Sequence, residues 1–222
     1  GPLISMRNDA LERTGDGISC TVESNELMME DGNASHWLIS GTFTAPQYTE
    51  SFFPPTLIRR TSAEDRTPVF VENREIPFWL VIPYSAVTTQ EPADLIIWGH
   101  GFLGNGNTNA LSGWANENNA AMLGTSFYGW ADDDFASIEF AVLNMHYFQH
   151  QAERLEQAMI NQVVMIKTFM GICSDLPDFY HTEEGEKMIN TTSPTYTGYS
   201  NGALRGPSII GLSPDLDRGV LW

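Results

Sequence analysis

The sequence predicts an α/β layered fold with a mostly parallel sheet flanked by helices. From residue 75 onward, short apolar runs typical of buried strands alternate with stretches whose apolar residues recur every three or four positions. Strands that alternate with helices specify a largely parallel sheet with helices packed on its faces. Residues 1–70 differ in texture. We expect them to form a β-rich N-terminal extension, either laid on a main domain at 71–222 or folded as a small module of its own.

The individual elements follow from local patterns. Strand-like runs at 37–39 and 41–44 are interrupted by Phe52-Phe53-Pro54-Pro55 and resume at 56–58. The apolar run 93–98 is of the kind that is buried on both faces of a parallel sheet. The main domain is expected to hold strands at 76–82, 93–98, 121–128, 195–199 and 218–222, and helices at 107–119, 135–145, 151–171 and 201–212.

The charge balance excludes several classes of partner. Eleven basic residues stand against 28 acidic ones, which gives a formal net charge of −17. Such a surface repels nucleic-acid phosphates and anionic lipid headgroups, so we expect no nucleic-acid partner. No apolar run approaches the roughly 18 residues that a transmembrane helix needs, so no transmembrane segment is expected.

Cysteines and acidic residues raise the questions of a disulfide and a metal site. Cys20 and Cys173 permit one disulfide or two buried free thiols, and the sequence does not decide between them. Two cysteines without a nearby His/Asp cluster argue against zinc. Asp132-Asp133-Asp134 precedes a helical pattern, where acidic side chains favour the helix dipole, so we interpret it as a cap rather than a cation site. No metal and no cofactor are expected.

The first motif with chemical meaning is Gly198-Tyr199-Ser200-Asn201-Gly202. A G-x-S-x-G pentapeptide alone is weak, but this one lies between an expected strand and an expected helix, where the chain must turn sharply. Glycines lack the Cβ atoms that would clash in such a turn. The turn would present the serine hydroxyl at the carboxyl edge of the sheet and place the Asn201 amide at a helix N-terminus.

The second motif is His100-Gly101-Phe102, directly after the expected strand at 93–98. Parallel strands place their carboxyl ends at one edge of a sheet, so this loop and Ser200 are expected to meet in space. A Phe102 backbone N–H would complete an oxyanion hole, and one such donor contributes about 3–4 kcal/mol of transition-state stabilisation.

The order of these elements and motifs resembles the α/β-hydrolase superfamily over residues 75–222. The segments 98–104, 128–132 and 212–215 are similar to those of secreted, lipase-like bacterial hydrolases. The resemblance implies that Ser200 is the nucleophile, that the Phe102 and Asn201 amides are oxyanion donors, and that His100 braces its loop instead of acting as a base. It also implies that three glycines support the site: Gly101, Gly198 and Gly202.

The chain departs from the superfamily because no histidine follows Ser200. The family order is serine, acid, histidine. We therefore expect the fold to lack its C-terminal part, the acid and histidine being supplied beyond Trp222 or by a second chain. A third alternative is an atypical site that uses His146 or His150. We expect both of these to be polar residues in a helix connection, and His36 and His181 to lie at the surface.

The expected function is carboxylic-ester hydrolysis of the lipase or esterase type, through an acyl-enzyme on Ser200. Tyr128, Trp130 and Tyr199 are expected to line a pocket for an ester or lipid-like small molecule. A peptidase, an acyltransferase or a catalytically degenerate binding domain are the alternatives. We expect the protein to be secreted or periplasmic in a bacterium, and these 222 residues alone to be inactive because a triad serine without its histidine loses about 10⁶ in turnover.

Overall fold

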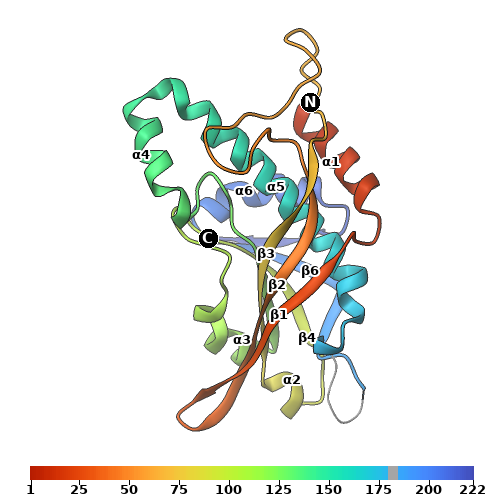
Figure 1. The fold of residues 1–222 in the computed structure, drawn as a ribbon. Helices are drawn as coiled ribbons and strands as arrows, with labels where there is room; N and C mark the ends of the chain where they lie inside the picture. The colour runs from red at the N-terminus through yellow and green to blue at the C-terminus, as the bar shows by residue number, and fades with distance from the viewer. Residues whose placement is uncertain (180–184) are drawn as a thin grey trace.

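The computed structural model describes residues 1–179 and 185–222. Seven strands form a single sheet in the order β1-β2-β3-β5-β4-β6-β7, with helices on both faces (Figure 1). The strands are β1 (Cys20–Glu30), β2 (Asn33–Gln47), β3 (Glu72–Pro83), β4 (Ala93–Gly99), β5 (Ala120–Gly124), β6 (Ile189–Gly198) and β7 (Gly219–Leu221).

One half of the sheet is antiparallel. β1 and β2 form a hairpin whose turn residues Asp31 and Gly32 have φ values of 49° and 80°. Two positive φ angles are what a tight type I′ turn requires, and Asp-Gly is a preferred pair for it. β2 then pairs with β3 along twelve residues, from His36 opposite Pro83 to Gln47 opposite Glu72. The N-terminal strands are thus continuous with the rest of the sheet.

The other half is parallel. Because only this half is parallel, the expectation of a mostly parallel sheet is wrong, and the sheet is mixed. β5, β4, β6 and β7 run in one direction, whereas β3 pairs with β5 in the opposite direction. The sheet therefore has three antiparallel and three parallel pairings. The physical reason is that β1 and β2 are joined by a tight hairpin, which forces antiparallel pairing, while helical crossovers return the chain in the same direction only from β4 onward.

Helices cover the sheet unequally. The main core lies between the sheet and a layer containing α1 (Pro2–Thr14), α5 (Phe148–Met170) and α6 (Asn201–Leu212), whereas α3 (Ser112–Asn118) covers a smaller cluster on the opposite face. Helix α1 was not expected. The remaining helices are α2 (Ser85–Thr88) and α4 (Phe135–Leu143), with short 3-10 turns η1 (Asn109–Leu111), η2 (Asp132–Asp134), η3 (Met145–Tyr147), η4 (Ile172–Asp175) and η5 (Pro177–Phe179).

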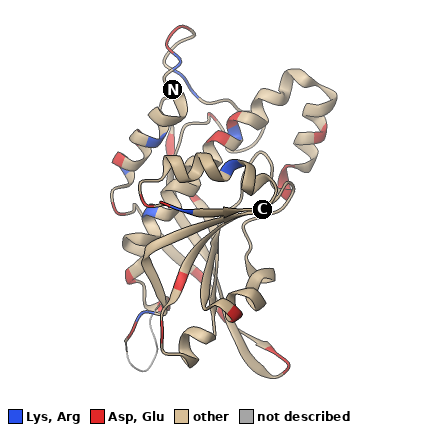
Figure 2. Cartoon of the chain, turned by 180° about the vertical axis from the view of Figure 1, so that it is seen from behind, with Lys and Arg blue, Asp and Glu red and all other residues tan. Residues whose placement is uncertain are grey.

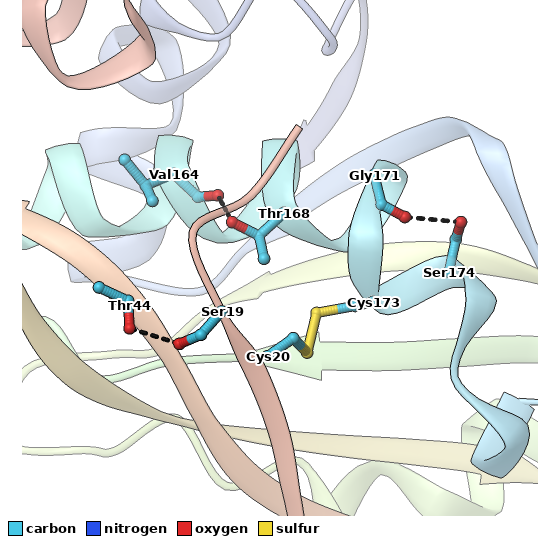
Figure 3. The surroundings of a disulfide bond; sticks show 8 residues. All are labelled: Ser19, Cys20, Thr44, Val164, Thr168, Gly171, Cys173 and Ser174. Carbon is cyan, nitrogen blue, oxygen red and sulfur yellow. Dashed lines mark hydrogen bonds between the residues drawn. A yellow bond between two sulfur atoms is a disulfide. The ribbon is translucent and has the colours of Figure 1, made fainter. Parts of the chain in front are cut away.

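A disulfide joins the antiparallel half to the helical layer. Cys20, the first residue of β1, is bonded to Cys173 in η4, just after the end of α5 (Figure 3). Cys173 is fully buried. Of the two alternatives that the sequence leaves open, the structure therefore has the bonded one.

Polar side chains of α5 fix the segment between β2 and β3. The buried Glu153 forms an ion pair with the partly buried Arg60 at 2.8 Å and accepts the Ile58 N–H. Gln157 Oε1 accepts the N–H of Tyr48 at 2.8 Å. Burial raises the pKa of Glu153, but hydrogen bonds from Arg60, Gln149 and Ile58 outweigh this effect and hold the pKa below its usual value. The first part of this segment, residues 48–60, is thus attached to α5.

Charged side chains are dispersed over the molecule. Figure 2 shows acidic residues on many separate elements instead of on one face. Within the described ranges, no helix is both long and apolar enough to cross a membrane.

Candidate active site

Ser200 lies in a sharp turn between β6 and α6. β6 ends at Gly198 and α6 begins at Asn201, so only Tyr199 and Ser200 connect them. The backbone of Ser200 has φ 52° and ψ −109°, a conformation that L-residues rarely adopt. Its side chain is exposed. A strained, exposed serine between a strand and a helix is typical of a functional site, since such strain costs about 1–3 kcal/mol and must be held by its surroundings.

Two glycines of the motif are required by close backbone contacts. A Cβ atom on Gly202 would lie 2.0 Å from the carbonyl oxygen of Gly99, and one on Gly198 would lie 2.5 Å from that of Gly202. Neither contact leaves room for a methyl group. The backbone at the end of β4 therefore packs in direct contact with the first turn of α6.

The loop after β4 runs beside Ser200. β4 and β6 are parallel neighbours with Gly99 opposite Gly198, and the Tyr199 N–H donates to Gly99 O at 3.0 Å. A Cβ atom on Gly101 would lie 3.6 Å from the Cβ of Ser200. The structure thus brings the two sequence motifs together at the carboxyl edge of the parallel strands.

Residues 101–104 form a tight turn that leaves the Phe102 amide unused. Gly104 N–H donates to Gly101 O at 3.1 Å, and Leu103 has φ 55°. Among the described residues, neither the Phe102 N–H nor the Asn201 N–H donates a hydrogen bond within the chain. The Asn201 amide lies at the N-terminus of α6, where free N–H groups and the helix dipole favour negative charge. Each amide N–H is therefore available to donate to a ligand.

His100 is buried and holds two segments together. Its Nε2 accepts the N–H of Phe127 at 2.7 Å, so Nδ1 carries the proton and donates to Gly101 O at 2.7 Å. Burial lowers the pKa of His100, against opposing effects of the Gly101 hydrogen bond and the Asp132 and Asp134 charges. A neutral ring with both nitrogens engaged fits the bracing role and leaves no free nitrogen for a base.

Aromatic rings surround the loop. The Phe102 ring lies edge-on to Trp130 at 5.2 Å, and Tyr199 lies 5.1 Å from Trp222. Phe102 and Tyr199 are 46% and 49% exposed. Tyr128, in contrast, packs against Phe52 of the N-terminal segment at 4.9 Å, and burial raises its pKa to about 12. Trp130 and Tyr199 thus lie at the loop, whereas Tyr128 makes its ring contact elsewhere.

The other described histidines contact residues other than Ser200. The His146 ring lies against Tyr147, and His150 Nδ1 donates to Thr56 O at 2.8 Å. His36 is buried with Nε2 2.7 Å from Asn109 Oδ1, so its expected surface position is wrong. His181 lies outside the described residues. Asp215 follows α6 and has Lys167 as its ionic neighbour at 3.9 Å.

The aspartate run is structural in the described part of the chain. Asp134 is buried, accepts the N–H of Ala131 at 3.1 Å and pairs with Arg154 of α5. No group of three or more His, Cys, Asp or Glu among the described residues is arranged to hold a metal ion. The sequence does not indicate the contact between Asp134 and Arg154, because the two residues are twenty positions apart and α4 lies between them.

Sheet and helix order together define a mixed α/β fold, in which helices flank a seven-stranded sheet. Solved structures agree: acetyl xylan esterase 1 from a Thermoanaerobacterium species is similar with a TM-score of 0.52 and 12% identity, over 99% of this chain and 57% of that protein. An acetyl xylan esterase from a Paenibacillus species is similar with a TM-score of 0.52 and 14% identity, over 99% and 58%. The chain therefore has the fold of these esterases and spans somewhat more than half of their length.

No protein-family model matches the sequence, and no curated protein matches it. At identities this low, the structural likeness establishes the fold and leaves the chemistry to be argued from the residues themselves.

Proposed function

We propose that this chain carries the nucleophile and the oxyanion donors of a serine hydrolase that cleaves carboxylic esters. The observation that carries the proposal is the strained, exposed Ser200 beside two backbone amides, of Phe102 and Asn201, that have no acceptor among the described residues. The fold likeness to acetyl xylan esterases supports an ester as the substrate class.

In the proposed mechanism, the Ser200 oxygen attacks the ester carbonyl carbon. The carbonyl oxygen becomes an oxyanion and accepts hydrogen bonds from the amides of Phe102 and Asn201. Collapse of this intermediate expels the alcohol and leaves an acyl group on Ser200, which water then removes. The rings of Phe102, Trp130 and Tyr199 would contact the substrate next to the scissile bond.

A general base and its acid partner complete the proposal. Among the described residues no histidine is hydrogen-bonded to Ser200, so we propose that the base histidine and its acid come from beyond these 222 residues or from a second chain. The isolated chain is then expected to be inactive or nearly so. Its disulfide fits an oxidising compartment, which supports a secreted or periplasmic protein.

A fluorophosphonate probe tests the nucleophile. The protein that naturally contains this sequence should be labelled at Ser200, and Ser200→Ala should abolish labelling. Ser208→Ala is the matched control, because Ser208 is an exposed serine of the same helix and should leave labelling unchanged. Labelling that survives Ser200→Ala would overturn the proposal.

A substrate panel tests the reaction. Short-chain and long-chain esters should be hydrolysed, and matched peptides should not. Hydrolysis of peptides, or transfer of the acyl group to an alcohol in preference to water, would replace ester hydrolysis by a peptidase or acyltransferase activity on the same serine. Labelled protein of a mass above 24.7 kDa would support the base being encoded beyond Trp222.

A further inference from the structure

We infer that the buried ion pair between Asp134 and Arg154 positions the loop that carries the Phe102 amide. The inference builds on the proposed function, because that loop supplies one of the two proposed oxyanion donors. The side chains of Asp134 and Arg154 are 3% and 6% exposed, so the pair lies in the interior. Neither residue belongs to the loop, and both would act through the intervening turn at 127–132.

The first link runs from the ion pair to the turn. One carboxylate oxygen of Asp134 is bound by Arg154, and the other accepts the backbone N–H groups of Gly129 and Ala131. Three donors thus converge on a single buried carboxylate. Gly129 has φ 96°, and a Cβ atom there would lie 2.7 Å from the carbonyl oxygen of Gln151 on α5. The turn is therefore clamped against the helix.

The second link runs from the turn to the loop. Leu103 N–H donates to Trp130 O at 3.0 Å, and Asp132 N–H donates to Gly104 O at 3.0 Å. Asn105 Nδ2 also donates to the Asp132 carboxylate at 2.7 Å. Trp130 lies between Gly129 and Ala131, whose N–H groups donate to Asp134. The Asp134 carboxylate therefore fixes the direction of the Trp130 carbonyl group. The turn thus holds Leu103 and Gly104, the two residues after Phe102, and the Gly104 N–H in turn donates to Gly101 O on the other side of Phe102.

The adjacent residue of α5 provides a comparison within the molecule. Glu153 is buried to a similar degree and pairs with Arg60, but it holds the Ile58 N–H in the N-terminal segment. Two neighbouring, buried residues of one helix thus form ion pairs with different segments. Only the Asp134–Arg154 pair is linked to residues 101–104.

Amide hydrogen exchange tests the positioning without any substrate. Asp134→Asn should accelerate exchange in peptides covering 100–106 by about tenfold or more, because the bonds to Leu103 and Asp132 loosen. Glu153→Gln, the matched control, should accelerate exchange at 56–60 and leave 100–106 unchanged. Equal protection of 100–106 in wild type and Asp134→Asn, or equal loosening by both variants, would overturn the inference.

Kinetics test the consequence for catalysis. Asp134→Asn should lower kcat for ester hydrolysis by about tenfold to a hundredfold with little change in KM, since a misplaced oxyanion donor acts on the transition state. Glu153→Gln should keep kcat at temperatures where both variants are folded. If both variants lost kcat equally, the Asp134–Arg154 pair would contribute only to overall stability, and the inference would be wrong. If wild type neither labels nor hydrolyses, the proposed function fails, while the exchange experiment still decides the positioning.

A milder surface variant guards against unfolding. Asp132→Ser removes the exposed bond to Asn105, and we expect the same changes in exchange and kcat, reduced to about twofold to fivefold. Asp133→Ser removes the neighbouring exposed carboxylate, for which the structure gives no side-chain bond to the loop, and should match wild type. A loop unaffected by Asp132→Ser, with Asp134→Asn unfolded, would contradict the inference.

Discussion

The two halves of the sheet differ in where their strands end. In the antiparallel half, β2 and β3 are long and pair along twelve residues, and successive strand ends lie at opposite edges. In the parallel half, β4 and β6 end side by side at Gly99 and Gly198, and both motifs begin there. Parallel strands gather their carboxyl ends at one edge, and that is why the candidate chemistry lies in the shorter, less extensively paired half.

The same contrast appears in how each half is held. The antiparallel half is attached to the helical layer by the Cys20–Cys173 disulfide and by the ion pair of Glu153. At its carboxyl edge the parallel half is held by backbone contacts between Gly99 and Gly202, and it contains the strained Ser200. The difference suggests that stability and chemistry can be perturbed separately, which the following experiments examine.

The largest effect is expected from the disulfide. Replacing both Cys20 and Cys173 by Ser should lower the free energy of unfolding by about 2–5 kcal/mol, because the bridge closes a long loop in the unfolded chain. Urea denaturation measures the loss, and fluorophosphonate labelling of Ser200 in folded protein should be unchanged. A parallel fall in labelling would show that the two halves are not separable.

Gly202→Ala should have the next largest effect. The new methyl group would overlap the carbonyl oxygen of Gly99, so we expect a loss of about 3 kcal/mol in urea denaturation together with loss of labelling. Gly211→Ala is the control, because Gly211 is in the same helix with nothing within 4 Å of its added Cβ. That substitution should stabilise by up to about 1 kcal/mol. Similar behaviour of the two variants would refute the close contact.

Ser200→Gly should raise stability and abolish labelling, whereas loss of the disulfide should lower stability and leave labelling unchanged. Glycine tolerates the positive φ at this position, so the free energy of unfolding should rise by about 1 kcal/mol while labelling disappears. Ser208→Gly, inside α6, should instead lower it by about 0.5 kcal/mol. Destabilisation by Ser200→Gly would mean that the serine backbone is not strained.

The smallest effect concerns pH. Burial holds the pKa of His100 below its ordinary value of 6.5, and the unfolded chain regains that value. The unfolded state therefore binds the proton more readily, so stability should fall as the pH drops below about 6.5 and level off below the folded pKa. Urea denaturation between about pH 8 and pH 5 should show a weaker fall for His100→Gln, which carries no charge. Equal slopes would contradict the buried neutral ring.

Local periodicity predicted most elements of the parallel half well, although the strand expected at 121–128 is β5 and already ends at Gly124. The strand at 93–98 is β4, the helix at 201–212 is α6, and the helix at 151–171 is α5 with slightly shifted ends. These segments are defined by neighbouring residues, and packing did not override their preferences. The position of Ser200 between a strand and a helix followed from the same local patterns.

Strand direction and long-range contacts could not be obtained in this way. Asp31-Gly32 between two strands is a hairpin signal, so the sequence does indicate the antiparallel hairpin. The spacing of Leu3, Met6 and Ala10 is helical and indicates α1. The burial of His36 depends on Asn109, which is distant in the sequence. No local pattern encodes such a partner.

The backbone at Ser200 also limits which side chains natural variation can place there. Threonine carries the same hydroxyl group, but a β-branched residue at φ 52° is a severe outlier. Cysteine keeps an unbranched Cβ and glycine has none, so both are compatible with the turn. Homologues that retain this bend are therefore expected to show serine or cysteine where they are active, glycine where they are not, and threonine in neither group.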